Sequence, residues 1–544
     1  MEETDKYINS IGSILIICLI IFSFFNSLNI GLAWDEYFHH LNGLLRFEYL
    51  KSLGDFEKYN YLSNQYYPGL SEYYPGLYDT ISYSIKYTLF IFDQNFYKKY
   101  FVEITHSVNF LFSVLSIVGF YLIVKIVFNK SIAVLATLLT LLNPFFFGHM
   151  GINPKDTIIF FSLIWFCYFY YKYINYEKNI YLNLILFSLF IGFGCGVRLA
   201  FLAAVFPIFL CGSVYLIKQS SDNYSNLIKR LSFHFILSFS VITLFTISCW
   251  PYIYENSLSL AFSTIKNLIF PSSALTGGPT LGLIDGLFYE TNNTPGTYFL
   301  NIIRFRIPFL FSILIFFSYL LVITNNNISK KYITNFDNKF IIINIIIFFP
   351  IITSLLLNVR IYDNLRLFIF ILPFLSLLAS FSLYHFLKNF NNSIKSKLGT
   401  MIILFFFSIF IYRFIFLTPY QYSYVNFSYF KIKDSLNKFE HDYWATSFKE
   451  LIEKTKTIYP QSEINKFKIA VCGGGKNALL VYLHKNLKIK KIYKLDQATH
   501  IIMTNRASFN INDKVTCFNK YEGDDLVSVS RNKLVFSVLR KMKK

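Results

Sequence analysis

The feature that most constrains the fold is a series of apolar stretches that recurs along most of the chain. A helix needs roughly 17 to 25 predominantly apolar residues to cross about 30 Å of hydrocarbon, and by that measure the sequence holds about eleven candidate spans. Their predicted bounds are 11–30, 105–127, 131–147, 156–174, 180–196, 199–217, 233–254, 307–324, 340–357, 366–384 and 398–417. Apolar residues make up 54% and charged residues 15% of the 544, a balance that excludes an ordinary soluble enzyme. We therefore predict an α-helical polytopic membrane protein.

The positions of lysine and arginine predict the orientation, because cytoplasmic loops carry an excess of both residues. They gather in alternate loops, from 125–130 to 388–397, which we expect in the cytoplasm. The acidic start of the chain and the lack of a small-residue cleavage pattern before Trp34 are unlike a cleaved signal peptide, so we expect the first span to be retained. The segments expected outside the cytoplasm are 31–104, 148–155, 196–199, 255–306, 358–365 and the tail 418–544.

Two adjacent carboxylates, Asp35 and Glu36, follow the first span directly. A carboxylate at the mouth of a hydrophobic span is costly unless it is solvated or used, so ionisable groups there are functional candidates. This placement predicts an active site at the outer surface of the membrane.

The acids and histidines in these outer segments raise the alternative of a metal site; they include His39, His40, His149 and Asp156. Carboxylate and imidazole groups are metal ligands, but neighbouring histidines on a helix point in different directions and chelate poorly. We expect no cofactor and no required divalent metal. The alternative roles of these histidines are packing and hydrogen bonding.

Basic side chains cluster at the predicted outer ends of several spans. Lys155 and Asp156 begin the fourth span, where Asp156 is either a simple helix-start charge or a residue that orders a phosphate site beside Lys155. Arg198, Arg360 and Arg366 lie at the same membrane face, and guanidinium groups match phosphate oxygens. We predict a donor-phosphate site formed by Lys155, Arg198, Arg360 and Arg366. Lone arginines at span ends are often snorkelling anchors, and for Arg304 and Arg306 this role and a part in a phosphate site stand as equal alternatives.

The first outer segment repeats one phrase, at 66–70 and again at 73–77, and continues into an aromatic, helix-like stretch at 78–92. Pro-Gly steps predict turns, and an aromatic stretch beside the membrane is typical of an interfacial segment. A role in gripping a lipid or a sugar is the alternative.

Composition changes near residue 418, so we predict two domains, a transmembrane domain at 1–417 and a small extracytoplasmic α/β domain at 418–544. Strand-like runs at 468–471 and 499–504, a helix at 476–484 and a hairpin at 526–539 support this prediction. The glycines of 473–475 lack the spacing of a phosphate loop, so nucleotide binding is not expected. The tail is strongly basic, which favours anionic lipid headgroups, and no nucleic acid partner is expected outside the cell. Whether Cys472 and Cys517 pair stays open.

Several of these motifs together carry a resemblance to a known family. They are Asp35-Glu36, 149–156, 360–366, 419–426 and 439–447, in that order along the chain. The sequence resembles the bacterial branch of glycosyltransferase family 39, which contains the dolichyl-phosphate-mannose protein mannosyltransferases. The resemblance implies the type C glycosyltransferase membrane fold, which that family shares with the lipid A aminoarabinose transferases.

The resemblance also implies an activity and a set of residues. It implies transfer of a sugar, a hexose, from a polyprenyl-phosphate carrier to a lipid, protein or glycan acceptor at the outer face of a bacterial inner (plasma) membrane. Asp35 matches the presumed catalytic base, Glu36 its neighbour, Asp156 the acid of the second outer loop and Arg366 the arginine of a later block. This chain departs from the family pattern with Asn364 in place of a glycine and Leu367 in place of a histidine.

The same chemistry follows from the residue types. A carboxylate takes the proton of an acceptor hydroxyl as that hydroxyl attacks the anomeric carbon, and cations neutralise the departing phosphate. A single displacement of this kind inverts the anomeric configuration. The competing class is a transporter or lipid flippase, which predicts polar or broken helices near the bilayer midplane and repeated halves. A non-catalytic assembly subunit and an oligosaccharyltransferase or glycan ligase, which transfers a preassembled glycan, are further alternatives.

Overall fold

The fold was taken from a computed structural model of the whole chain. It describes residues 2–66, 75–175, 179–219, 224–254, 259, 262–263, 280–324, 336–389, 394–426, 438–508, 512–531 and 533–543. Most of the repeated phrase at 66–77 therefore lies outside the described residues, as do parts of the predicted outer loop 255–306.

The described chain is mostly helical, and nine of its helical segments are long and apolar enough to cross a membrane. A tenth joins α14 (Tyr298–Arg306) and α15 (Phe309–Ile323) across a bend of 112°. The nine are α1 (Glu2–Asn29), α6 (Phe101–Val127), α9 (Asp156–Ile174), α10 (Ile180–Val197), α11 (Phe201–Gln219), α12 (Tyr224–Ile247), α17 (Phe336–Leu356), η2 with α18 (Arg366–Ile371 and Leu372–Lys388) and α19 (Ile394–Phe416).

The predicted class, a helical polytopic membrane protein with a small C-terminal α/β unit, is confirmed, but the number of spans differs from about eleven. The apolar stretch predicted at 131–147 forms α7 (Lys130–Leu142), which has only 13 residues and is followed by α8 (Pro144–His149). Asn143 separates the two helices, because its side chain caps α8 and Pro144 takes the first helical position. The stretch predicted at 307–324 is likewise short, since α15 has 15 residues.

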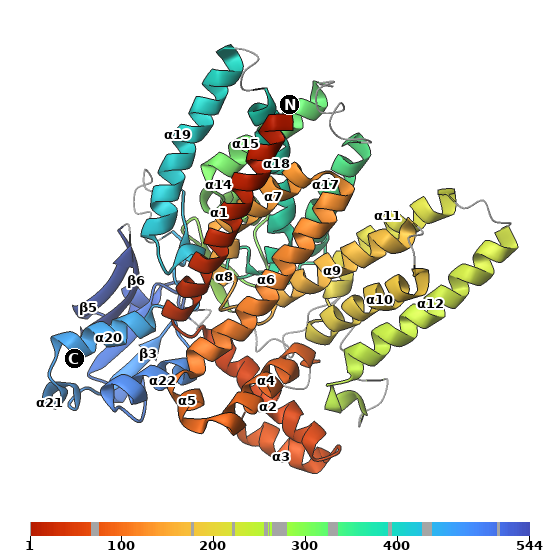
Figure 1. Cartoon of the computed structure of the whole chain (residues 1–544). Coiled ribbons are helices and arrows are strands. Elements are labelled where there is room, and N and C mark those ends of the chain that lie inside the picture. Colours follow the sequence, from red (N-terminus) through yellow and green to blue (C-terminus); the bar gives the residue numbers. More distant parts are fainter. Residues whose placement is uncertain are drawn as a thin grey trace.

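The helices run between two ends of the molecule, as Figure 1 shows. At one end lie α2 (Trp34–Lys51), α3 (Phe56–Tyr66), α4 (Leu77–Phe92), α5 (Gln94–Lys99) and the C-terminal unit. The N-terminus lies at the other end, where Asp5 pairs with Lys388 at 2.5 Å and accepts a hydrogen bond from Ser131. The described parts of the first outer segment and of the tail, predicted on one side of the membrane, therefore lie at one end of the bundle.

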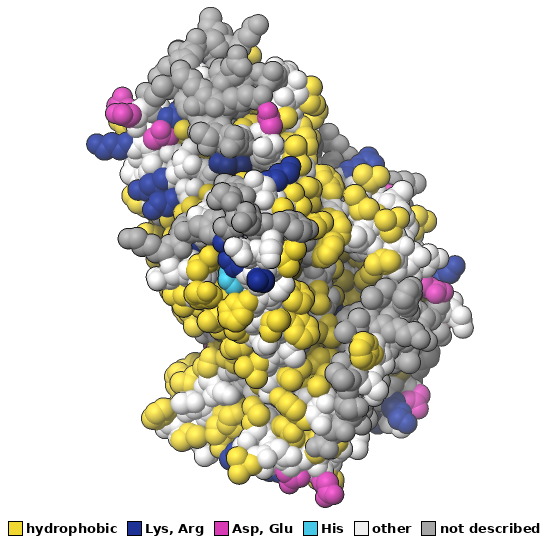
Figure 2. Space-filling model, turned by 90° about the vertical axis from the view of Figure 1, so that its right-hand side faces the viewer, with side chains coloured by type: hydrophobic (Ala, Val, Ile, Leu, Met, Phe, Trp, Pro, Cys, Tyr) yellow, Lys and Arg dark blue, Asp and Glu magenta, His cyan; other side chains and the backbone are white. Residues whose placement is uncertain are grey.

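The surface of the helical region is strongly apolar. On the face drawn in Figure 2, hydrophobic side chains cover a broad part of the described surface and acidic side chains lie toward its edges. In α1 and α12 the exposed apolar residues include Ile14, Ile17, Phe235, Ile236 and Leu244, each more than half exposed. Such surfaces fit a hydrocarbon environment, since monomeric soluble proteins rarely carry apolar patches of this extent.

The C-terminal unit contains one four-stranded sheet in the order β3-β4-β6-β5. Strands β3 (Ile469–Cys472) and β4 (His500–Thr504) are parallel, and β5 (Gly523–Arg531) pairs antiparallel with β6 (Leu534–Met542), which confirms the predicted hairpin. The other elements of the unit are α20 (Phe448–Ile458), α21 (Gln461–Ile464), α22 (Lys476–Leu487) and α23 (Cys517–Lys520). Cys472 and Cys517 form a disulfide between β3 and α23.

Several bonds join this unit to the membrane helices. The backbone N–H of Trp34 donates to the Trp444 carbonyl at 3.1 Å, and that of Leu32 donates to the Tyr482 hydroxyl at 2.6 Å. Arg306, for which snorkelling is one of the two predicted roles, is instead buried and donates to the carbonyls of Ser423, Tyr424 and Glu440. The division into domains at 417/418 stays a prediction, although α19 ends nearby at Phe416.

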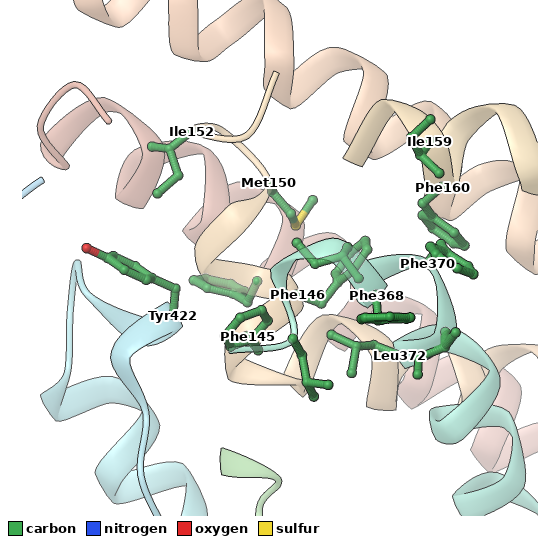
Figure 3. Close-up of a cluster of buried hydrophobic side chains, with 14 of the residues drawn as sticks. Phe145, Phe146, Met150, Ile152, Ile159, Phe160, Phe368, Phe370, Leu372 and Tyr422 are labelled. Atoms are coloured by element: carbon green, nitrogen blue, oxygen red, sulfur yellow. The ribbon is translucent and has the colours of Figure 1, made fainter. Parts of the chain in front are cut away.

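A buried apolar cluster supports the loops that carry the charged residues. In Figure 3 the side chains of Phe145, Phe146 and Met150 lie beside Phe368 of η2. On the far side Phe160 of α9 contacts Phe146, with ring centroids 5.5 Å apart. This packing fixes the loop between α8 and α9 against the segment that begins at Arg366, so residues far apart in sequence are held side by side.

Candidate active site

Asp35 lies in the first turn of α2, directly after the connection from α1. Its Oδ2 atom lies 2.6 Å from Nη2 of Arg366, the first residue of η2. Its side chain is 30% exposed. Within the described part of the chain its second oxygen, Oδ1, has no hydrogen-bond partner. Asp35 therefore offers one anchored and one available carboxylate oxygen.

Arg366 holds three carboxylates at once. Besides Asp35, its Nε donates to Asp156 at 3.1 Å and its Nη1 to Asp363 at 2.8 Å. Arg366 is buried, and its guanidinium carbon lies 4.8 Å from the centre of the Trp444 ring. A planar guanidinium with five donors suits such a shared site, and a lysine ammonium does not reproduce it.

Asp156 lies at the end of the second outer loop, beside two cations, Lys155 and Arg198. Asp156 begins α9, and its backbone N–H donates to the side chain of Asn153, which fixes the turn before the helix. Its carboxylate also lies 3.5 Å from Nη1 of Arg198, at the end of α10. Lys155 is buried beside it and acts electrostatically on both Asp35 and Asp156. Lys155, Asp156, Arg198 and Arg366 thus gather around Asp35 as the sequence predicts.

The loop before Arg366 explains one departure from the family pattern. Asp363 and Asn364 both have positive φ, 57° and 61°, in the left-handed region. Asparagine and aspartate tolerate this conformation better than most residues other than glycine. Asn364 therefore adopts a backbone conformation that the expected glycine would also adopt, and the tight loop is retained.

Electrostatics keep Asp35 ionised. Burial by itself raises the pKa of its carboxyl group, but Arg366 and, after it, Lys155, His39 and Arg506 lower it well below its usual range. Opposite charges within a few ångströms favour the charged form of a carboxyl group. Asp35 is therefore a carboxylate throughout the physiological pH range.

Glu36 points away from Arg366 and is engaged in the fold. Its Oε2 accepts the backbone N–H of Ala33 at 2.7 Å and lies 3.0 Å from Nε2 of His106. Its Oε1 accepts from Nδ2 of Asn109 at 3.1 Å. These contacts join the start of α2 to α6, whereas the sequence placed Glu36 beside Asp35 as a catalytic group.

Arg360 and Arg366 both lie over the ring of Tyr362, with their guanidinium carbons 5.3 and 5.2 Å from its centre. The Arg360 guanidinium donates to the hydroxyls of Thr291 and Thr280, both at 3.0 Å. It joins the loop before η2 to the short hairpin of β1 (Leu281–Ile284) and β2 (Leu287–Glu290). These bonds hold Arg360 at the hairpin, and its predicted phosphate role stays a prediction.

A buried lysine that sequence reasoning missed lies beside the site. Lys86 of α4 is 2% exposed, and no described residue forms a hydrogen bond or ion pair with it. It lines a small cavity, together with Glu36, His39, Asp79 and Pro154, the residue before Lys155. Burial lowers its pKa to about 8, although Glu36 and Asp79 act in the opposite direction. The only sequence signal was a lysine inside a helix-like, aromatic stretch.

The wall of this cavity is a chain of hydrogen bonds between α2 and α4. His39 Nδ1 lies 3.0 Å from both carboxylate oxygens of Asp79, which also accepts from Asn42 at 2.5 Å. Asn42 in turn accepts from Arg46, which donates to the Pro75 carbonyl at 3.0 Å. These bonds hold His39 in place and leave it engaged with Asp79.

The acids and histidines near Asp35 do not form a metal-binding cluster where the structure describes them. In the described ranges, no group of three or more histidines, cysteines, aspartates and glutamates is arranged to hold a metal ion. His40 packs against the rings of Phe101 and Tyr83, and His149 lies 2.8 Å from the Tyr443 hydroxyl. The absence of a required metal or cofactor stays a prediction.

Comparison with known structures gives distant matches over most of the chain. One is the archaeal oligosaccharyltransferase AglB from Archaeoglobus fulgidus in complex with an inhibitory peptide and a dolichol-phosphate, at 12% identity and a TM-score of 0.42, over 92% of this chain and 69% of that chain. Another is the apo form of the Archaeoglobus fulgidus oligosaccharyltransferase, at 13% identity and a TM-score of 0.41, over 91% of this chain and 65% of that chain. No curated protein matches the chain significantly.

A family model matches part of the sequence directly. The model is described as dolichyl-phosphate-mannose-protein mannosyltransferase, and it covers residues 82–250. This range runs from α4 to the end of α12 and includes Lys86, Lys155, Asp156 and Arg198. The resemblance identified from the sequence is thereby confirmed: over residues 82–250 this chain matches the dolichyl-phosphate-mannose-protein mannosyltransferase family.

Proposed function

We propose that this chain is a membrane glycosyltransferase that moves a sugar from a polyprenyl-phosphate donor to an acceptor hydroxyl, with Asp35 as the catalytic base. The observation that carries the proposal is the geometry of Asp35. One of its oxygens is fixed 2.6 Å from Arg366, and the other has no partner among the described residues. Four charged side chains from three other segments gather in the same site: Lys155 and Asp156 at the start of α9, Arg198 at the end of α10 and Arg366 at the start of η2.

The reaction is a single displacement. The acceptor oxygen attacks the anomeric carbon of the sugar while the bond from that carbon to the phosphate oxygen breaks. The acceptor proton passes to the available oxygen of Asp35, a general-base step. The products are the glycosylated acceptor with inverted anomeric configuration, polyprenyl phosphate and a protonated Asp35 that returns its proton to solvent.

Cations beside Asp35 suit the departing phosphate. Lys155 and Arg198 lie next to Asp156, and Lys86 lines the adjoining cavity without a described partner. Positive groups fixed where negative charge develops stabilise a transition state strongly in a site shielded from water. When phosphate shares the charge of these cations, their effect on Asp35 weakens and its basicity rises.

The donor class and the side of the membrane are parts of the proposal. The family match favours a lipid-phosphate sugar donor. The Cys472–Cys517 disulfide favours an oxidising compartment for the end of the molecule that holds Asp35, because disulfides rarely persist in the cytosol. The acceptor is a hydroxyl of a protein, lipid or glycan.

Transfer from radiolabelled polyprenyl-phosphate hexoses tests the proposal. Membranes carrying wild type, Asp35→Asn or Glu48→Gln are compared at equal protein abundance. Glu48 is the matched control, since it lies on the same helix and pairs at the surface with Lys58. We expect label to reach an acceptor with wild type and Glu48→Gln, and the rate to fall by about 10²- to 10⁴-fold with Asp35→Asn.

Two outcomes contradict the proposal. Wild-type transfer that survives Asp35→Asn removes Asp35 as the base. Absence of transfer from every donor in a panel of sugars and lipid lengths, with folded protein present, removes the transferase and favours the transporter class.

A further inference from the structure

Two loops of the C-terminal unit reach the start of α2. Strands β3 and β4 are parallel and adjacent, so their carboxyl ends lie at one edge of the sheet. The glycines 473–475 follow β3, and Arg506 follows β4. Loops at such an edge are a common location for functional side chains in α/β units.

Both loops contact Trp34, the neighbour of Asp35. A Cβ atom on Gly475 would lie 3.1 Å from the Trp34 ring, so the absence of a side chain allows this close approach. The guanidinium carbon of Arg506 lies 4.9 Å from the centre of the same ring. The glycine segment therefore serves as a contact surface for Trp34.

Arg506 is also connected to Asp35 through two other side chains. Its Nη2 lies 3.0 Å from Oδ1 of Asp363, whose other oxygen lies 2.8 Å from Nη1 of Arg366. Arg366 in turn lies 2.6 Å from Asp35. Asp363 is thus shared between an arginine of the C-terminal unit and the arginine that anchors the proposed base.

Each of the two arginines that contact Asp363 also lies over a tryptophan ring. Arg506 lies over Trp34, and Arg366 lies over Trp444, which belongs to the segment before α20. The Trp34 backbone N–H donates to the Trp444 carbonyl, which ties the two pairs together. Arg506 also donates to the Tyr443 carbonyl, so its position is fixed from both sides.

We propose that Arg506 is a positioning residue for the catalytic centre, so that the C-terminal unit completes the active site. This inference rests on the proposed function. Asp363 is fully buried and balanced by two arginines. Without Arg506, Asp363 loses one of its two arginines, and Arg366 shifts toward Asp363 and away from Asp35.

Two effects of removing Arg506 follow. A small displacement of a group that fixes a catalytic residue can cost about 10²-fold in rate. The loss of a positive charge near Asp35 also raises the pKa of Asp35, since Arg506 is one of the groups that lower it. The acid limb of the rate profile therefore moves to higher pH, an effect that a purely structural role for Arg506 would not produce. The charged groups around Asp35 that set this limb are Arg366, Lys155, His39 and Arg506.

The test uses the full chain in membranes or detergent, with Arg506→Met, Arg506→Lys and Arg531→Met. Arg531 is the matched control, since it belongs to the same unit and pairs at 2.8 Å with Glu450, which does not contact the site. Transfer rates are measured against donor concentration and pH, after thermal unfolding has shown that each variant is folded.

We expect Arg506→Met to lower kcat by about 10- to 100-fold, with a smaller change in KM and an acid limb at higher pH. Arg506→Lys should restore part of the rate and most of the pH profile, and Arg531→Met should leave the pH profile unchanged. In a double-mutant cycle, Arg506→Met should cost little more in an Asp363→Asn background, because both act through one contact.

Four outcomes overturn the inference. Wild-type transfer with an unchanged kcat and acid limb in Arg506→Met overturns it while the proposed function stands. An acid limb that moves as far in Arg531→Met as in Arg506→Met has the same consequence. So do effects of Arg506→Met and Asp363→Asn on the transfer rate that add fully in the double variant. Absence of wild-type transfer overturns the proposed function, and this inference with it.

Discussion

Arg366 Nη2 lies 2.6 Å from Asp35 Oδ2, although the two residues lie far apart in the sequence. The contact joins the first turn of α2 to the start of η2, and the same guanidinium reaches Asp156 at the start of α9. Three helix starts are therefore fixed by one side chain. This arrangement makes Arg366 the centre of the candidate site and allows its role to be separated from that of its neighbours.

Replacing Arg366 should disturb both activity and stability. Arg366→Lys keeps the charge but loses the fork that serves three carboxylates, so we expect transfer to fall by at least about 10²-fold and the free energy of unfolding to fall by about 3–5 kcal/mol. Arg360→Lys is the control from the same loop, because Arg360 donates to Thr280 and Thr291 and lies over the ring of Tyr362. Thermal unfolding in detergent and transfer rates measure both effects. Equal losses in the two variants would contradict the central role of Arg366.

Glu36 and Asp35 should respond differently to the same change. Two donors that face Glu36, the Ala33 N–H and the Asn109 amide, need an acceptor oxygen, and Nε2 of His106 lies 3.0 Å from the same carboxylate. The amide group of Glu36→Gln offers one oxygen where the carboxylate offers two, so we expect a loss of about 1–3 kcal/mol in the free energy of unfolding. Asp35→Asn should leave stability nearly unchanged and abolish transfer. A Glu36→Gln protein of normal stability without transfer would restore Glu36 to the catalytic role predicted from the sequence.

Lys86 should make stability depend on pH in the alkaline range. Its pKa in the folded protein is lowered by burial to about 8, against an ordinary value of 10.5. Between these values the unfolded chain holds a proton that the folded chain has released, so this group makes stability rise with pH from about 8 to 10.5. Lys86→Met should remove that rise, and Lys58→Met, at an exposed site, should not. Unfolding followed across this pH range provides the measurement, and an unchanged profile in Lys86→Met would contradict it.

Lys86 should also affect the donor. If its ammonium meets the donor phosphate, the KM for the donor should rise as pH increases through about 8, because the positive charge is lost. Lys86→Arg should move this rise to higher pH, since a guanidinium stays charged. Initial rates at several donor concentrations between pH 6 and 10 decide the matter. A donor KM that rises at the same pH in wild type and Lys86→Arg would assign the titration to another group.

The disulfide should stabilise the C-terminal unit. It closes a loop with a sequence separation of 45, for which loop-closure entropy predicts a contribution of about 4 kcal/mol. Cys472→Ala with Cys517→Ala should lower the thermal midpoint, and reductant should lower that of the wild type but leave the double variant unchanged. Because Gly475, in the loop after β3, packs beside Trp34, transfer should weaken as the unit loosens. A wild-type midpoint that reductant does not change would show that the bond contributes little.

Much of the fold was predictable because hydrophobicity has a strong local signature. The predicted spans proved mainly helical where described, and the span predicted at 156–174 coincides with α9. The span predicted at 131–147 was too long. Apolar composition continues across Asn143 and Pro144, but α7 ends before Asn143 and α8 begins at Pro144. The β5–β6 hairpin was predictable from alternation and turn residues over a short range.

By itself, the sequence determined the membrane class, the end of the bundle that holds the charged residues, and the membership of Asp35, Asp156 and Arg366 in one site. Only the tertiary structure decided that Glu36 binds His106 and Asn109, that Arg360 binds threonines, and that Lys86 and Arg506 lie near Asp35. The physical reason is the distance along the chain over which each kind of interaction acts. Apolar length and charge placement act along the chain, whereas the direction of a side chain and its partner depend on packing between segments hundreds of residues apart, such as Trp34 against Gly475.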